Sequence, residues 1–248
     1  MKVSKDKFSV QAEIYKKFRP VYPEKLYELI LKATANRDVV WDCATGNGQV
    51  ANVLSKYFNK VYATDISEQQ LKHAIQCDNI IYSVQRAEHS TFSDQQFDLI
   101  TVAQAMHWFD FDAFSKEANR VLKDDGTICV WGYGPLKMEN KVGELVDKFY
   151  KDVVGPYWDD ERKHIDEGYK NVKLNFKHIE IHNEFAIEEQ WTIEQLQGYF
   201  DSWSSVQNYI AKNNINPVPD IMKEIAKVWG NKERFTTRLP IFMKIGKK

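Results

Sequence analysis

The sequence has few of the features that mark secreted, membrane-bound or metal-binding proteins. Its 248 residues include three cysteines, Cys43, Cys77 and Cys129, none of them in C-x-x-C spacing. Cys43 and Cys129 fall in apolar runs that we expect to be buried strands, which favours reduced core thiols over disulfides or metal ligands. The sequence shows no cluster of metal-ligating residues, and we expect no bound metal.

Long apolar runs and an excess of one charge are missing as well. The N-terminal segment MKVSKDKFSV has no apolar core of a signal peptide, and no run approaches the length of a transmembrane helix. We therefore expect a soluble, cytoplasmic protein with no membrane partner. The net charge of -1 gives no overall attraction to nucleic acid, so we expect no nucleic-acid partner.

What the sequence does contain is a strongly patterned stretch at residues 39–65, VVWDCATGNGQVANVLSKYFNKVYATD. A short apolar run stops at Asp42, a turn with Gly46 and Gly48 follows, and apolar residues then recur at helical spacing. A second apolar run ends at Asp65. This order predicts a strand, a glycine turn, a helix and a strand, which is the first βαβ unit of a nucleotide-binding sheet.

Two cofactor classes use this arrangement, and Asp42 discriminates between them. The turn fits the dinucleotide fingerprint G-x-G-x-x-[GA], with Asp65 about 20 residues beyond it. A dinucleotide places its pyrophosphate at the helix N-terminus, where the carboxylate of Asp42 would repel it. The same carboxylate would suit the ammonium of a methionine-like group. A strand–helix unit that binds no ligand is the remaining alternative.

The spacing D-C-A-T-G-N-G resembles motif I of the class I S-adenosylmethionine-dependent methyltransferases, written [DE]-x-G-x-G-x-G. Ala44 stands in place of the first glycine of that motif. The resemblance implies that S-adenosylmethionine is the cofactor. Around the turn and the second strand it implies cofactor contacts by Asp42, Ala44, Gly46, Gly48, Gln49, Asp65 and Ile66.

Two later segments extend the resemblance. Ala87 and Glu88 follow the third expected strand, residues 80–84, at the place where the family meets the adenine edge. The string F-D-L-I-T-V-A-Q-A-M-H-W-F-D, residues 97–110, resembles motif IV of the same group. This second string implies two more cofactor contacts, Ala103 and Gln104.

His107 lies in the same string, at the expected carboxyl end of a parallel strand, where ligands bind. One interpretation is a polar side chain whose hydrogen bonds are satisfied within the fold. The other is a catalytic residue that touches the substrate and acts as a general base. We predict the second role.

The N-terminal phrase A-x-x-Y-x-x-F-R-P-x-Y-P resembles the opening of a small-molecule group that includes the trans-aconitate methyltransferases. In related enzymes this segment caps the cofactor pocket. Arg19 would then pair with a carboxylate of the cofactor or substrate, and Tyr15 would contact the substrate. The alternative is a lid helix that carries a solvated arginine.

Two segments, residues 152–172 and 189–230, are expected to form a cap over the pocket. The first is polar and contains Gly155-Pro156, which indicates an inserted loop or lid rather than a sheet element. Tyr133, after the fifth expected strand, and Trp203, in a helical segment, are predicted to contact the substrate. Packing beneath a loop is the alternative for Tyr133, and packing in a helix core is the alternative for Trp203.

The resemblance implies an α/β fold with a Rossmann-like, mostly parallel sheet of seven strands, helices on both faces and a helical cap. The family's strand order is 3-2-1-4-5-7-6, with the last strand antiparallel. We place the sixth strand at residues 176–185 and the last at 235–245. We expect one methyltransferase domain over residues 1–248, made of an N-terminal cap segment at 1–22, a cofactor-binding core at 23–150, the two cap segments and the last strand.

These features predict a methyltransferase that acts on an oxygen, carboxylate or hydroxyl, of a small-molecule substrate, as a monomer or homodimer. A hydroxyl would need the base His107, whereas a carboxylate would need cations, for which Arg19 and Arg86 are the candidates. An NAD-dependent oxidoreductase with a Rossmann fold and a non-catalytic nucleotide-binding module are the alternatives.

Overall fold

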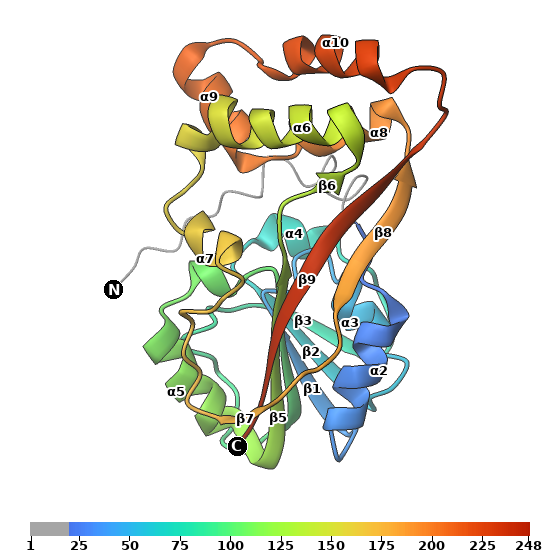
Figure 1. Ribbon diagram of the computed structural model, residues 1–248. Coiled ribbons are helices and arrows are strands. Elements are labelled where there is room, and N and C mark those ends of the chain that lie inside the picture. Colours follow the sequence, from blue (N-terminus) through green and yellow to red (C-terminus); the bar gives the residue numbers. More distant parts are fainter. Residues whose placement is uncertain (1–19) are drawn as a thin grey trace.

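The structure, a computed structural model, describes residues 20–248. These residues form a sheet of nine strands. Seven of the strands follow the order β3-β2-β1-β4-β5-β9-β6, and β7 and β8 also pair with β9 (Figure 1). The strands are β1(Val39–Cys43), β2(Lys60–Asp65), β3(Ile80–Val84), β4(Phe97–Ala103), β5(Leu122–Tyr133), β6(Lys137–Met138), β7(Lys177–Ile179), β8(Phe185–Trp191) and β9(Phe235–Lys247).

The expected sheet is confirmed in its order and directions. The neighbours β3, β2, β1, β4 and β5 are parallel, and β9 runs antiparallel beside β5. The carboxyl ends of the parallel strands therefore meet at one edge of the sheet, as the ligand site requires.

The expected number of seven strands is wrong. The region predicted as one strand at residues 176–185 forms two, β7 and β8, and the short strand β6 was not foreseen. β7 pairs with one end of β9, where Ile179 faces Ile245, and β8 pairs with the other end, where Trp191 faces Phe235. The long strand β9 thus pairs with β7 and β8 one after the other, and residues 180–184, which are polar except for Ile181, connect these two strands.

The helices follow the capping signals of the sequence. Thr192 and Gln195 form a reciprocal capping box at the start of α8, and the Ser67 side chain accepts from the Gln70 amide at the start of α4. The helices are α2(Glu24–Ala33), α3(Gln49–Leu54), α4(Glu68–Lys72), α5(Phe111–Val121), α6(Asn140–Lys148), α7(Arg162–Asp166), α8(Ile193–Asp201), α9(Ser204–Asn213) and α10(Val218–Trp229), with shorter turns η2(Met106–Trp108), η3(Phe149–Val153) and η4(Gly155–Tyr157).

Both faces of the sheet are covered, which explains why the central strands β1 and β4 are buried along nearly their whole length. Ile100 packs in a cluster with residues of α5, whereas its neighbour Leu99 packs in a cluster with residues of α2 and α3. Figure 1 shows α5 on one face and α2 and α3 on the other. Cys43 and Cys129 are buried free thiols in these strands, as predicted.

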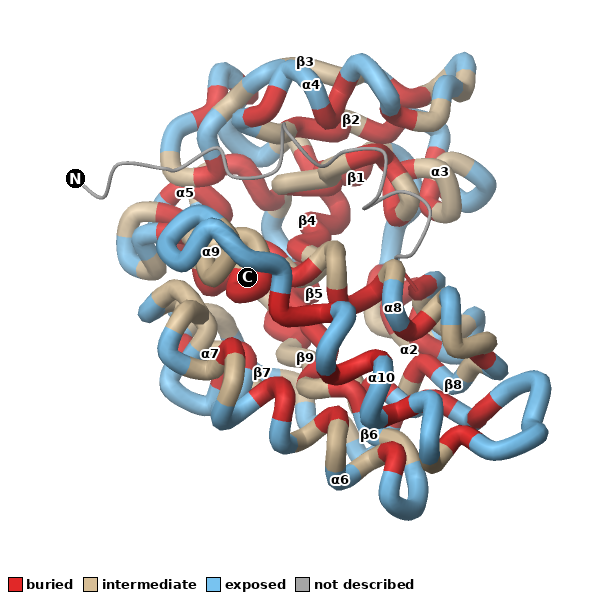
Figure 2. The backbone as a smooth tube through the Cα atoms, turned by 90° about the horizontal axis from the view of Figure 1, so that it is seen from above, coloured by how far each residue is buried: buried red, intermediate tan, exposed pale blue. Residues whose placement is uncertain are grey.

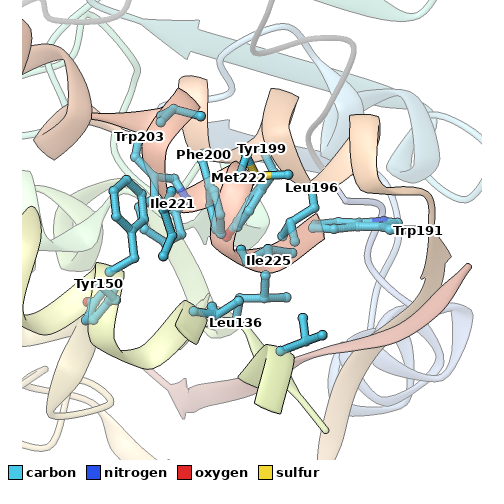
Figure 3. Close-up of a cluster of buried hydrophobic side chains, with 14 of the residues drawn as sticks. Leu136, Tyr150, Trp191, Leu196, Tyr199, Phe200, Trp203, Ile221, Met222 and Ile225 are labelled. Atoms are coloured by element: carbon cyan, nitrogen blue, oxygen red, sulfur yellow. The ribbon is translucent and has the colours of Figure 1, made fainter. Parts of the chain in front are cut away.

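The helices α6, α8, α9 and α10 lie at the end of the sheet where the parallel strands terminate (Figure 1). Seen from above, α6, α8 and α10 lie over the β9 side, while α3 and α4 flank the β1 to β3 side (Figure 2). An apolar cluster joins these helices, and Figure 3 shows Leu196, Ile221 and Ile225 within it.

Residues 152–172, which we expected to form an inserted loop or lid rather than a sheet element, contain short helices. This segment contains η4 and α7, and Ile165, Tyr169 and Val172 are buried in the same cluster as Trp41 of β1. The segment therefore has an apolar face that packs onto the sheet, which the many polar residues in its sequence do not indicate. Among residues 20–248, no helix is long and apolar enough to cross a membrane.

Candidate active site

A cleft opens where the parallel strands end, and we call it the glycine-turn cleft. It encloses about 510 Å³ of space, including its solvent-open mouth. Of the predicted cofactor contacts it gathers Asp42, Ala44, Gly46, Gln49, Ala103 and Gln104. The other residues that line it are Pro20, Tyr22, Thr45, Asn47, Val50 and Tyr133.

Asp42, near the end of β1, places a buried carboxyl group in this cleft. Its side chain accepts hydrogen bonds from Thr45 Oγ1 at 2.5 Å and from Thr101 Oγ1 at 2.8 Å, and the residue is only 1% exposed. Burial raises the pKa of Asp42 to about 6, the charge of Asp65 adds to this, and the hydrogen bonds oppose it. A positively charged group in the cleft would therefore stabilise the ionised carboxylate.

The turn after β1 depends on backbone conformations that favour glycine. Ala44, Gly46 and Gly48 all have positive φ, at 56°, 58° and 80°. A Cβ added to Gly46 would meet no atom within 4 Å, whereas one added to Gly48 would collide with the hydroxyl of Tyr82. Gly46 keeps the cleft open, while Gly48, which is not among the described residues that line it, makes room for Tyr82.

Asp65, at the end of β2, is held beside the same turn. Its carboxylate accepts from the backbone amides of Gly46 and Ser67, each at 2.9 Å. Asp65 and its neighbour Ile66 are outside the group of described residues that line the glycine-turn cleft. The hydrogen bond to Gly46 nevertheless fixes the Asp65 carboxylate at the edge of the turn.

Ala87 and Glu88 lie farther along, after β3, and they do not line the glycine-turn cleft in the described part of the chain. Ala87 is buried, and Glu88 accepts from the backbone amide of Asp110 at 3.2 Å. Glu88 also lies 3.5 Å from an Nη of Arg86. This loop is thereby attached to the start of α5, and its predicted contact with a cofactor stays a prediction.

A second cleft adjoins the first, and we call it the aromatic cleft. It encloses about 730 Å³ of space, including its open mouth, and shares Gln104 and Tyr133 with the glycine-turn cleft. Its remaining lining residues are His107, Trp108, Pro135, Leu136, Tyr150, Trp158, Asp159, Arg162, Tyr199, Ser202, Trp203 and Ser204. The predicted substrate residues His107, Tyr133 and Trp203 are thus brought together.

His107 lies on η2, directly after β4, and is 7% exposed. Its Nδ1 is 3.0 Å from the hydroxyl of Tyr169, and its ring lies 4.8 Å from that of Trp108. The strand-end position agrees with the sequence analysis. The partner, Tyr169, comes from the segment that was expected to be a loop.

Trp203 is both a core residue and a lining residue. Its ring is stacked on that of Phe149, with the ring centres 5.9 Å apart. The ring of Tyr150 lies 5.6 Å away, and Figure 3 labels both Trp203 and Tyr150. Its 7% exposure therefore faces the aromatic cleft from within the apolar cluster. Trp203 therefore packs in the apolar core and also lines the cleft in which we expected the substrate.

Comparisons with known proteins agree with this geometry. Residues 41–130 match the methyltransferase domain family. A protein of Dictyostelium discoideum whose name describes a methyltransferase is 33% identical over 251 residues, covering 98% of this chain and 95% of that protein. A structure described as a type II methyltransferase of Anaeromyxobacter dehalogenans has a TM-score of 0.85 at 30% identity, covering 93% of this chain and 98% of that one. The chain belongs to the class I S-adenosylmethionine-dependent methyltransferases.

S-adenosylmethionine is the cofactor of this methyltransferase, and the glycine-turn cleft fits it. The open space beside Gly46 lets a ligand approach the backbone, and the buried Asp42 calls for a positive charge such as the ammonium of the methionine part. The Saccharomyces cerevisiae protein named as the S-adenosylmethionine-dependent methyltransferase CRG1 is a further relative, 24% identical over 252 residues, covering 85% of this chain and 86% of that protein.

The sequence analysis missed Arg162 of the methyltransferase. Its Nε donates to the Tyr150 hydroxyl at 3.0 Å and lies 3.5 Å from Asp166, and its guanidinium lies 4.4 Å from the ring centre of Trp158. In the sequence it stands in the charged run DDERKH, which is typical of a solvated face. Trp158 and Arg162 are four residues apart in the sequence, but Trp158 is extended and α7 begins only at Arg162, so helical spacing gives no signal of their contact.

Neither of the two cations proposed from the sequence, Arg19 and Arg86, is placed in the aromatic cleft by the described residues. Arg19, with Tyr15, lies outside the described residues. Arg86 has a side chain that is 44% exposed, is paired with Glu88 and does not line the aromatic cleft. Arg162 is thus the cation that the described residues supply to this cleft.

Proposed function

We propose that this methyltransferase acts on an oxygen atom of a small molecule held in the aromatic cleft. The observation that carries the proposal is the shared wall of the two clefts, formed by Gln104 and Tyr133. A ligand in one cleft would lie directly beside a ligand in the other. This is the arrangement that a transfer between two bound molecules requires.

Different residues at the glycine-turn cleft would bind different parts of the cofactor. Asp42 would bind the ammonium group, the backbone at Gly46 would lie against the ligand, and Asp65 would accept hydrogen bonds from the ribose hydroxyls. When bound, S-adenosylmethionine supplies an electrophilic methyl group on a positively charged sulfur. The protein's part is then to orient and to exclude water, since positioning accounts for much of the acceleration of such a transfer.

The aromatic cleft supplies the second half of the site. Tyr150, Trp158 and Trp203 present large apolar surfaces with polar tips, which suit a small organic molecule. A carboxylate needs no base, whereas a hydroxyl would need one, and His107 is the candidate. The resemblance to the group that includes trans-aconitate methyltransferases supports a carboxylate.

The remaining expectations belong to the same proposal. The near-neutral net charge supports a small-molecule substrate rather than nucleic acid. We further propose a monomer or homodimer in the cytoplasm with no membrane partner, and a single domain in which Tyr15 and Arg19 contribute to the closed site.

The competing cofactor can be tested directly. We expect S-adenosylmethionine to raise the melting temperature and NAD to leave it unchanged, because ligand binding stabilises the native state. Incubation with a panel of small acids and phenols should then release S-adenosylhomocysteine with some of them. Stabilisation by NAD, or the absence of methyl transfer to any small molecule together with transfer to RNA or protein, would contradict the proposal.

A further inference from the structure

The hydroxyl of Tyr169 lies within hydrogen-bond distance of one ring nitrogen of His107. Tyr169 is 0% exposed, and its oxygen lies 3.0 Å from His107 Nδ1. Burial holds the pKa of Tyr169 well above its usual range, although hydrogen bonds from the backbone of His107 and Met106 act in the opposite direction. The phenol therefore keeps its proton, and a buried hydroxyl needs an acceptor for it.

The structure places Nδ1 of His107 where it can accept that hydrogen. A neutral imidazole that accepts at Nδ1 carries its own hydrogen at Nε2. Such a ring has no lone pair at Nε2 with which to remove a proton from a ligand. His107, which lines the aromatic cleft, is thereby prepared as a hydrogen-bond donor, and the general-base role is disfavoured.

Arg162 adds a fixed positive charge to the same cleft. Its polar contacts with Tyr150 and Asp166 are both made through Nε. The Tyr150 hydroxyl donates a hydrogen bond to Asp166 at 2.6 Å, so its oxygen is oriented to accept one from Arg162. The paired Nη groups of a guanidinium have the geometry that binds a carboxylate with two parallel hydrogen bonds.

Trp158 supplies a third donor. Its indole Nε1 is buried and has no hydrogen-bond partner among the described residues, and its ring lies under the guanidinium of Arg162. Trp158 also lines the aromatic cleft. Because an unpartnered buried donor is unfavourable, this position suits an oxygen of a ligand.

We propose that the aromatic cleft binds a carboxylic acid as its carboxylate, held by Arg162 and Trp158, with His107 as a donor through Nε2. The proposal rests on the proposed function only in taking this cleft as the site of the methyl acceptor. An amine is the competing class, because the carboxylate of Asp159 also lines the cleft and could pair with an ammonium group.

Matched probes separate these classes. Phenylacetate, phenylacetamide and phenethylamine would be titrated by calorimetry into protein saturated with S-adenosylhomocysteine. We expect phenylacetate to bind about tenfold or more tightly than either other probe, because the carboxylate pairs with a desolvated guanidinium. Equal affinity for the amide, preference for the amine, or the absence of saturable phenylacetate binding would overturn the proposal.

Substitutions of Arg162 and Asp159 test whether phenylacetate binds in the aromatic cleft. Arg162→Met should weaken phenylacetate binding by about tenfold or more and Arg162→Lys by less, since lysine keeps the charge without the fork. Asp159→Asn should strengthen it, whereas an amine site would be weakened. Binding of S-adenosylhomocysteine, measured in the same proteins, reports correct folding. If wild type fails to bind S-adenosylhomocysteine while phenylacetate still binds, the proposed function fails and the carboxylate site stands.

The tautomer has its own readout. Nitrogen NMR of His107 should show hydrogen on Nε2 at neutral pH, and Tyr169→Phe should remove that preference. His107→Gln offers an amide N–H at a similar reach and should retain phenylacetate binding within about threefold, whereas His107→Ala should lose about tenfold. Hydrogen on Nδ1, or equal loss in both variants, would overturn the donor role.

Discussion

Gln104 and Tyr133 are joined twice across the wall between the two clefts. The Gln104 Oε1 accepts from the Tyr133 amide at 2.7 Å, and its Nε2 donates to the Tyr133 carbonyl at 3.3 Å. Gln104 adopts a positive φ of 53° and bonds its own amide to the Trp131 carbonyl at 2.8 Å. The side chain predicted as a cofactor contact thus ties the end of β4 to the end of β5.

Replacing Gln104 by leucine should therefore affect both clefts together. The buried backbone groups of Tyr133 would lose their partners, which should lower the free energy of unfolding by about 1–3 kcal/mol. Affinities for S-adenosylmethionine and for the methyl acceptor should both fall. Gln190→Leu is the control, because Gln190 bonds Thr236 at an exposed position and lines neither cleft in the described part of the chain. Loss of only one of the two affinities would show that Gln104 serves a single cleft.

Asp42→Asn should make the protein more stable and bind the cofactor less well. The pKa of Asp42 is raised from 3.8 to about 6 in the folded state. Its contribution to stability is therefore present below the unfolded value and is lost as the pH rises through about 6. Near pH 7 the ionised group destabilises the ligand-free fold by up to about 3 kcal/mol, which asparagine would remove.

The same shift predicts how cofactor binding depends on pH. A bound ammonium favours the ionised form of Asp42, so the affinity for S-adenosylmethionine should rise as the pH rises from 5 to 7, by up to about tenfold per pH unit below the folded pKa. Calorimetry across this range, with thermal unfolding of wild type and Asp42→Asn, tests both statements. A variant that melts lower at neutral pH and binds normally would contradict them.

The order of the sheet could be predicted because its signals are local. Between Val39 and Tyr133, the spacing of apolar residues within each segment predicts whether that segment forms a strand or a helix. The division of the sixth strand could not be predicted, because it arises from pairing with the distant strand β9, in which Ile245 faces Ile179 and Phe235 faces Trp191. Residues 180–184, polar except for Ile181, interrupt the apolar pattern but do not indicate two separate strands.

The site shows the same division between local and distant causes. The motif spacing identified Asp42 and Gly46, whose roles depend on the turn itself. Arg162 was missed because its charged neighbours suggest solvent, while the aromatic residues that surround it, Tyr150 and Trp158, act only once the cap is folded. The pairing of His107 with Tyr169 spans a separation of 62 residues and has no sequence signature.

Asp65→Ala should weaken binding of S-adenosylmethionine by about 1–3 kcal/mol, the range for leaving polar groups unpaired. Part of this loss would come from the turn, because the Gly46 and Ser67 amides lose their shared partner. Asp65→Asn keeps one oxygen, so it can retain only one of the two backbone hydrogen bonds, and it cannot accept from two ribose hydroxyls as a carboxylate does. Calorimetry that found unchanged affinity in a folded Asp65→Ala variant would refute the ribose assignment.

The two glycines of the turn should respond differently to a single added methyl group. At Gly46 the new Cβ meets no protein atom within 4 Å, so stability should fall only by the roughly 1 kcal/mol that a positive φ costs alanine. The methyl group would, however, project beside the cleft. Gly46→Ala should therefore reduce cofactor affinity strongly with little change in melting temperature.

At Gly48 the added Cβ collides with the Tyr82 hydroxyl, which itself donates to the Ile75 carbonyl at 2.5 Å. Gly48→Ala should therefore lower the free energy of unfolding by about 1–3 kcal/mol through overpacking. Removing the hydroxyl in the double variant Gly48→Ala with Tyr82→Phe should recover part of that loss, measured against Tyr82→Phe alone. Equal losses of cofactor affinity at both glycines, with no recovery in the double variant, would show that Gly48 also contacts the cofactor.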